Sequence, residues 1–259
     1  ISVIDPDSST ATTTYDDWTV TVTDAKGHQT KRTSDAYGRL LQVEEFNESQ
    51  IYTTTYQYDA LNNLTQTTDH ASTVIQVSYD SLARKLSMDD PDMGHWAYAY
   101  DDVDNLLTQT DARGVSTTFQ YDELNRVISK SYQIPPGSDI LDPGAVAYTY
   151  DDQQQPYAKG KLTNVTEVED ASRFEYDNLG RLTEETKTIQ SQEHTLQRAY
   201  DLLGRLTTLT YPDDAVVTYT YNAQGGLETI AYDSLATGHW PLVTDVTYTA
   251  AGQITRLAY

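Results

Sequence analysis

The chain of 259 residues carries 39 acidic against 17 basic side chains, and the resulting net charge of −22 is spread along its whole length. Such a field repels phosphate backbones and argues against nucleic-acid binding. The lack of cysteine excludes disulfides and thiolate metal sites. The sequence contains no apolar run of about 18 residues, which is the signal that would predict a membrane-spanning helix. Tyrosine outnumbers phenylalanine by 21 to 3, which favours half-buried β-sheets.

The first 23 residues are predicted to form a strand-rich lead-in that continues an upstream repeat. From residue 24 to residue 259 we predict a single repeat domain, built from about ten copies of one short unit. Because the chain begins at Ile1 without a methionine and stops directly after a repeat-like segment, we interpret it as a piece of a longer protein.

The repeated unit is clearest at residues 176–183 and 200–207, which both read Tyr-Asp-x-Leu-Gly-Arg-Leu-Thr. Several copies follow one another at an interval of 21 residues, and longer intervals mark loop insertions near residues 133–144 and 153–156. The residues expected to carry the repeat structurally are Tyr58, Asp59, Tyr79, Asp80, Tyr100, Asp101, Tyr121, Asp122, Tyr150, Asp151, Tyr176, Asp177, Gly180, Arg181, Tyr200, Asp201, Gly204, Arg205 and Tyr221.

Each unit is predicted to be a β-hairpin. Aromatic residues before the aspartate alternate with polar or small ones, as in Tyr56-Gln57-Tyr58, and a period of two indicates a half-buried strand. The glycine or asparagine after the aspartate accepts the positive φ of a tight turn, so that valine at Gly180 or Gly204 should destabilise its hairpin. A second turn closes each unit at residues 24–27, 69–72, 111–114 and 212–215.

The predicted fold class is therefore all-β. Tandem hairpins should form a long, curved and spiralling antiparallel sheet, because a sheet of about twenty strands must twist and coil.

Two acidic clusters, at residues 89–92 and 101–105, resemble calcium loops in composition. Neither has EF-hand spacing, and solvated turns are the favoured interpretation over calcium binding. The Asp-Pro pairs at residues 90–91 and 142–143 are likewise interpreted as turns.

The tripeptide Gly-His-Trp occurs twice, at residues 94–96 and 238–240. Each copy opens a strand that leads to a repeat tyrosine, so both tryptophans are expected to pack on the aromatic face. Two histidines without a third ligand nearby argue against zinc. The sequence also lacks the common nucleophile, zinc-protease and phosphate-loop motifs. We therefore predict no catalytic residue, no metal, no cofactor and no enzyme activity.

The repeated Tyr-Asp-x-Leu-Gly-Arg-Leu-Thr resembles the tyrosine-aspartate, or RHS/YD, repeat family over nearly the whole chain. Similar repeats occur in bacterial polymorphic toxins, in the B and C components of insecticidal toxin complexes and in teneurins. The resemblance implies long hairpins wound into a hollow shell, which in the bacterial toxins encloses a C-terminal toxin. The conserved core segment that follows such repeats, with its cleavage function, is not found in this sequence.

Two functional hypotheses follow. The resemblance implies a structural shell segment of a secreted bacterial toxin, with the remaining repeats or a partner shell subunit and an enclosed toxin polypeptide as its partners. The alternative is a cell-surface adhesion module that binds carbohydrate or protein on exposed tyrosine and tryptophan side chains.

Overall fold

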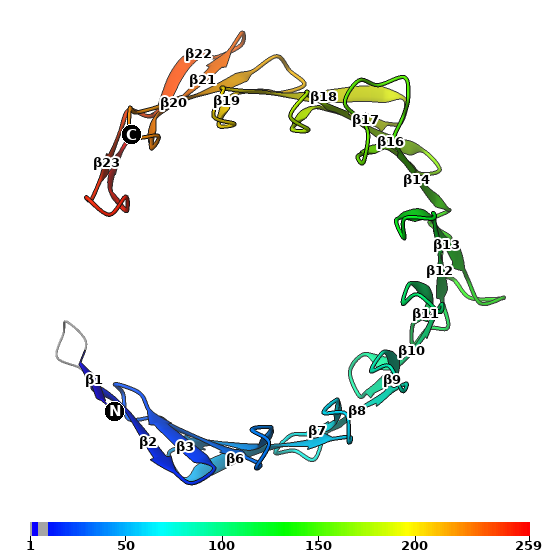
Figure 1. Cartoon of the computed structure of the whole chain (residues 1–259), viewed down its shortest axis with the longest axis vertical. Helices are drawn as coiled ribbons and strands as arrows, with labels where there is room; N and C mark the ends of the chain where they lie inside the picture. Colours follow the sequence, from blue (N-terminus) through cyan, green and yellow to red (C-terminus); the bar gives the residue numbers. More distant parts are fainter. Residues whose placement is uncertain (1, 5–9) are drawn as a thin grey trace. The chain divides into compact units, whose positions relative to one another are not determined.

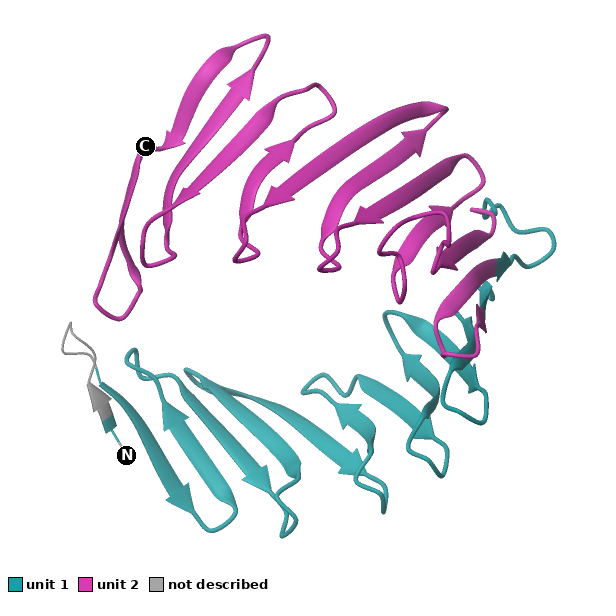
Figure 2. Cartoon of the chain, turned by 45° about the horizontal axis from the view of Figure 1, so that its top comes forward, with its two compact units in different colours: residues 1–119, 132–142 teal, residues 120–131, 143–259 magenta. Residues whose placement is uncertain are grey.

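The computed structural model describes residues 2–4 and 10–259, which form 24 β-strands and no α-helix. Two compact units are present, shown in separate colours in Figure 2. Unit 1 comprises residues 1–119 and 132–142, and unit 2 comprises residues 120–131 and 143–259.

Unit 1 holds eleven complete strands and the start of a twelfth. They are β1 (Ser2–Ile4), β2 (Thr10–Asp16), β3 (Thr19–Thr23), β4 (Gln29–Ser34), β5 (Leu40–Asn47), β6 (Gln50–Tyr58), β7 (Leu64–Thr68), β8 (Val74–Tyr79), β9 (Lys85–Asp90), β10 (Gly94–Tyr100), β11 (Leu106–Thr110) and β12 (Ser116–Tyr121). Each pairs antiparallel with the next strand in the chain, from β1 through to β12.

Unit 2 continues the same pattern from β13, most of which it contains. Its strands are β13 (Val127–Gln133), β14 (Val146–Tyr150), β15 (Leu162–Thr166), β16 (Asp170–Tyr176), β17 (Leu182–Ile189), β18 (Gln192–Tyr200), β19 (Leu206–Thr210), β20 (Val216–Tyr221), β21 (Leu227–Ser234), β22 (Gly238–Val243), β23 (Asp245–Tyr248) and β24 (Ile254–Ala258). Consecutive strands pair antiparallel from β13 to β22, and β23 with β24 forms a separate hairpin. The succession of hairpins can be followed by colour in Figure 1. The predicted all-β array of tandem hairpins is confirmed.

Alternation along the strands divides each sheet into an aromatic face and a polar face. Tyr56 and Tyr58 are half-buried while Gln57 between them is exposed, and Ala99 is likewise exposed between two half-buried tyrosines. Cross-strand partners keep the polar set together, since Gln57 lies opposite Gln66 and Gln66 lies opposite Gln76. The predicted period of two is therefore present in the structure.

Very few side chains are fully buried, because the hairpins lie in a single layer. The accessible surface is 17274 Å², whereas a compact monomer of this mass exposes about 11,000 Å². The buried apolar side chains are Val115, Ala158, Ala215, Val217, Val243 and Val246. A core this small cannot account for the stability of the folded array, so contacts between successive hairpins must supply much of that stability.

The two Gly-His-Trp segments form the same local structure. In each, the histidine contacts an aspartate on the paired strand, His95 with Asp89 at 2.7 Å and His239 with Asp233 at 2.6 Å. Packing of both tryptophans was expected, but only Trp96 is half-buried; Trp240 is 56% exposed. The difference arises because β10 is flanked by β9 and β11, whereas the described pairings of β22 are with β21 alone.

Candidate functional site

The aspartate of each repeat organises the turn that follows it. In the turn after β16, the carboxylate oxygen Oδ1 of Asp177 accepts hydrogen bonds from the backbone N–H groups of Leu179 and Arg181, at 2.9 and 3.0 Å. The main chain closes the turn, since the N–H of Asp177 donates to the carbonyl of Arg181 and the N–H of Gly180 donates to the carbonyl of Asp177. The same pair of carboxylate contacts recurs at Asp35, Asp59, Asp80, Asp101, Asp122 and Asp201.

The third residue after the aspartate has a positive φ, as predicted. Gly180 has φ 75° and Gly204 has φ 82°, and asparagine occupies the same position with φ 69° at Asn62 and 59° at Asn125. Glycine and asparagine tolerate this left-handed conformation better than other residues. Ala83, with φ 63°, shows that the hydrogen bonds of the turn can also hold a less tolerant residue there.

In five repeats an arginine four residues after the aspartate links the turn to the next one, whereas Asn63 and Asn105 take this position after Asp59 and Asp101. The Nε of Arg181 contacts the second carboxylate oxygen of Asp177 at 2.6 Å, and its Nη1 donates to the carbonyl of Asp201 in the following turn at 3.0 Å. The guanidinium carbon also lies 4.7 Å from the centre of the Tyr200 ring, within the range of a cation–π contact. One side chain thus bridges two successive hairpins.

The same arginine arrangement recurs in both units. Arg39 stacks on Tyr58 and Arg84 on Tyr100 in unit 1, and Arg126 stacks on Tyr150 and Arg205 on Tyr221 in unit 2. Lysine takes the position once, where the Lys161 ammonium lies 5.5 Å from the centre of the Tyr176 ring.

The tyrosine that precedes the aspartate completes the link in the opposite direction. The hydroxyl of Tyr200 donates to the carbonyl of Leu182 at 2.9 Å, and Leu182 belongs to the preceding hairpin. Equivalent bonds join Tyr58 to Leu40, Tyr176 to Leu162, Tyr221 to Leu206 and Tyr248 to Leu227. We call this set of aspartate, arginine and tyrosine contacts between consecutive turns the Tyr-Asp-Arg ladder.

The threonine of the motif occupies a β-bulge. The register shifts between Glu175 and Tyr176, so that Tyr176 lies opposite Leu182 and Thr183 is left without a direct partner across the pair. Its hydroxyl donates to the carbonyl of Glu175 at 3.2 Å, and Thr65 makes the same bond in unit 1. Bulges increase local twist, so the motif also contributes to the twist of the sheet.

The ladder also fixes the charge state of its aspartates. The pKa of Asp201 is lowered, chiefly by the backbone N–H of Arg205 and then by the guanidinium of the same residue, which outweigh the effect of desolvation. The arginine of such an Asp–Arg pair is affected as well. In the pair of Asp80 and Arg84, the hydrogen bond to Asp80 raises the pKa of Arg84. In the repeats that carry the arginine, the aspartate and the arginine thus form a pair of opposite charges, although the chain as a whole is strongly acidic.

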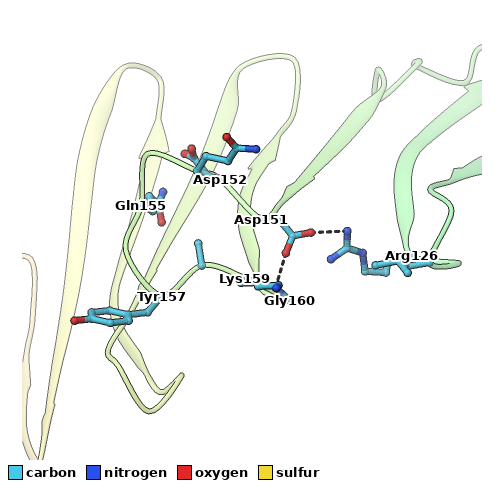
Figure 3. A pocket seen from close by; sticks show the side chains of 10 residues that line it. Arg126, Asp151, Asp152, Gln155, Tyr157, Lys159 and Gly160 are labelled. Atoms are coloured by element: carbon cyan, nitrogen blue, oxygen red, sulfur yellow. Dashed lines mark hydrogen bonds and ion pairs between the residues drawn. The ribbon is translucent and has the colours of Figure 1, made fainter.

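One repeat departs from this pattern because an insertion widens its turn. Residues 151–161 replace the usual five-residue loop, and the N–H of Asp151 donates to the carbonyl of Lys161 at 3.1 Å. Figure 3 shows Asp151 between Arg126, 2.7 Å away, and the backbone N–H of Gly160. The widened turn borders a cavity of about 510 Å³ that is also lined by Leu124.

The structure brings together most of the residues that the sequence singled out. Tyr58, Tyr100, Tyr150, Tyr176, Tyr200 and Tyr221 lie in the ladder with the aspartates and with Arg181 and Arg205. Tyr79, whose pKa is raised by burial, lies at a bulge before Asp80. Sequence reasoning missed Arg39, Arg84 and Arg126 as bridging residues, although their spacing of four from an aspartate was a usable signal.

The described residues contain no cluster of three histidine, cysteine, aspartate or glutamate side chains that could hold a metal ion. Within the same residues no helix is long and apolar enough to cross a membrane.

Comparison with known proteins agrees with this geometry. Residues 100–132 match the RHS repeat family model, and residues 147–257 match the teneurin YD-shell family model. No curated protein matches the chain significantly in sequence.

Solved structures with the same fold include the TcdB2-TccC3 complex, which is 18% identical with a TM-score of 0.84. The Photorhabdus luminescens Tc holotoxin pore is also 18% identical, with a TM-score of 0.83. The match covers 100% of this chain but only 15% of the compared chain in both cases. On the repeat motif, the ladder that it forms and these two family matches, the chain belongs to the RHS/YD repeat family.

Proposed function

We propose that this chain is a structural segment of the shell of a secreted bacterial toxin or toxin-complex component, which encloses a C-terminal toxic polypeptide and helps to deliver it. The observation that carries the proposal is the Tyr-Asp-Arg ladder. Its side chains contact neighbouring hairpins of the same chain, as Arg181 contacts Tyr200. Such contacts join successive hairpins into a sheet that can serve as a shell wall, and they do not assemble a reaction centre.

The chemistry of the ladder also supports a role without catalysis. Its aspartates are held ionised by backbone N–H groups and arginine, so they are poor general acids near neutral pH. The partners that we infer are the remaining repeats of the same protein or a partner shell subunit, and the enclosed toxin polypeptide. The inferred location is outside the bacterial cell, either secreted or at the cell surface.

The test uses the full-length protein from which the chain comes. Its intact mass and an image of the particle by electron microscopy should reveal a closed hollow body with additional density inside. Limited proteolysis should leave the C-terminal segment intact in the native particle and degrade it when the particle is opened with denaturant. A full-length protein imaged as an open ribbon, with a C-terminal segment cleaved at the same rate in both conditions, would contradict containment and favour adhesion.

A matched pair of variants links that test to the ladder. Arg181→Glu places a negative charge beside Asp177 and removes the contact with Tyr200, so the full-length particle should admit protease. Lys159→Glu makes the same change of charge at an exposed position in the widened turn and should leave protection unchanged. Equal protection of the C-terminal segment in both variants would show that the ladder does not hold the wall closed.

A further inference from the structure

The widened turn between Asp151 and Lys161 contains more residues than the Tyr-Asp-Arg ladder requires. The bond that closes it, from the N–H of Asp151 to the carbonyl of Lys161, spans ten positions, whereas the equivalent bond of the turn at Asp177 spans four. The ladder contacts are nevertheless present, since Asp151 pairs with Arg126 at 2.7 Å and Lys161 lies over the next ladder tyrosine. The inserted residues are therefore not needed for the ladder. Insertions on a rigid scaffold commonly carry binding functions.

The insertion borders the cavity of about 510 Å³, together with Leu124 and Arg126 from the preceding turn. All of these residues belong to unit 2. The volume lies within the range of small-ligand pockets, about 300 to 1,000 Å³. Two large lining side chains, Leu124 and Tyr157, are 70% and 57% exposed. A ligand that covers them would therefore bury apolar surface that the fold leaves in water.

Tyr157 has an unfavourable backbone conformation in this loop. Its φ is 64°, in the left-handed region that bulky residues rarely adopt. Backbone strain of this kind persists where the surrounding structure holds it, and it clusters at binding and catalytic sites. Because the Tyr157 side chain is largely exposed, burial does not explain the choice of residue. Its conformation and its exposure both fit a side chain that contacts a ligand.

Gln155 carries an amide that the fold leaves unsatisfied. Its Oε1 and Nε2 atoms are both buried, and neither has a hydrogen-bond partner among the described residues. Burying an amide without a partner costs free energy, and native structures normally supply one. Gln155 also lines the cavity, and Figure 3 shows it in the same loop as Tyr157. A rotation of the side chain can thus present the amide to a ligand in the cavity.

Other polar groups around the cavity already have partners within the chain. One carboxylate oxygen of Asp151 contacts Arg126 and the other accepts the N–H of Gly160. The Asp152 carboxylate accepts the N–H of Gln154 at 2.9 Å. These groups gain little from a ligand rich in charges or hydroxyl groups, such as a carbohydrate. The ligand that fits best therefore matches one side-chain amide and an apolar surface.

We infer that the widened turn is a binding site for an extended, uncharged peptide segment of a partner protein, with a large apolar side chain at the residue that pairs with Gln155. The N–H and C=O of one extended residue can bond to the same partner, as they do in antiparallel sheets. A side-chain amide offers the complementary acceptor and donor next to each other. One peptide residue thus satisfies both polar atoms of Gln155, while its side chain packs against Leu124 and Tyr157. The inference does not depend on an enclosed toxin, so it can hold or fail separately from the proposed shell.

An NMR titration of the isotopically labelled chain tests the inference. The probe is N-acetyl-leucine N-methylamide, which places one leucine between two peptide groups. Added up to about 10 mM, it should shift the side-chain amide signals of Gln155 and the backbone signals of Ala158. An analogue in which an ester oxygen replaces the leucine N–H should bind about tenfold more weakly, because it cannot donate to Oε1 of Gln155. The corresponding glutamate derivative should also bind more weakly, because its side chain is charged.

A matched pair of variants assigns the binding to the amide. Gln155→Met keeps the length of the side chain but removes both polar atoms, so it should weaken binding of the leucine probe about tenfold. Gln154→Met makes the same change at the exposed neighbouring position and should bind the probe like the wild type. Hydrogen exchange at the N–H of Lys161, which donates to the carbonyl of Ala158, reports whether the loop is still folded in each variant.

Three results would overturn the inference. The leucine probe could shift no signal of the loop, the ester analogue could bind to the wild type as tightly as the probe, or a folded Gln155→Met variant could bind the probe as the Gln154→Met variant does. If Gln155→Met unfolds the loop, the comparison of probe and ester analogue on the wild type still decides. Tighter binding of N-acetylglucosamine than of the leucine probe would also contradict a peptide site and would identify a carbohydrate site.

Discussion

Valine in place of Gly204 gives the sharpest test of the repeat turn. Gly204 has φ 82° and its N–H donates to the carbonyl of Asp201 at 3.0 Å, so the turn needs this conformation. A Cβ at this position would meet no obstacle, since the nearest atom, Nη1 of Arg181, would lie at 3.8 Å. The cost of valine therefore comes from the backbone conformation and not from a clash.

The matched control is Gly204→Asn, because asparagine occupies the same position at Asn62 with φ 69°. Both substitutions remove the extra freedom of glycine in the unfolded chain, so that contribution largely cancels in the comparison. What remains is the penalty of a left-handed conformation, about 1 to 2 kcal/mol for an ordinary L-residue and less for asparagine.

Hydrogen exchange is the suitable measurement, because a repeat array opens locally and a single global unfolding free energy would average over many hairpins. The reporters are the N–H groups of Leu203 and Arg205, which both donate to the Asp201 carboxylate. They should exchange about 5 to 30 times faster in the valine variant than in the asparagine variant. Exchange rates that agree within about twofold would refute the assignment of strain to this turn position.

Three further predictions concern the ladder. Tyr200→Phe removes the hydroxyl that donates to the preceding hairpin and should cost about 0.5 to 1.5 kcal/mol in the local opening free energy of that hairpin, measured by hydrogen exchange. Because the Asp201 pKa lies below its usual value of 3.8, mainly through the N–H of Arg205, ionised Asp201 stabilises the fold above that pH, and the stabilisation is lost as the pH falls through the lowered pKa. As the pH is lowered below 3.8, protonation of Asp201 should loosen its turn before the turn at Asn222 loosens, because the Asn222 amide makes the same bonds without titrating. A pH titration followed by NMR measures this difference. Arg181→Lys should raise exchange in its own turn and in the turn that begins at Asp201, since lysine cannot bridge both; a change confined to its own turn would contradict the link.

Much of the local structure could be read from the sequence because it depends on short-range rules. Alternation around Tyr58 predicted the strand, and glycine at residues 180 and 204 predicted the positive φ of the turns. The bulge at Thr183 was missed, because a one-residue shift in pairing leaves both strands with ordinary strand residues. The exposure of Trp240 was also missed, since it depends on which strands flank β22 and not on the segment itself.

The sequence by itself therefore determined the repeat, its hairpin and its turn residues, since each follows from backbone preferences within a few positions. Only the tertiary structure decided what those residues contact. Arg181 lies near Asp177 by sequence spacing, but its bond to Asp201 and its position over Tyr200 require two hairpins to be paired in register.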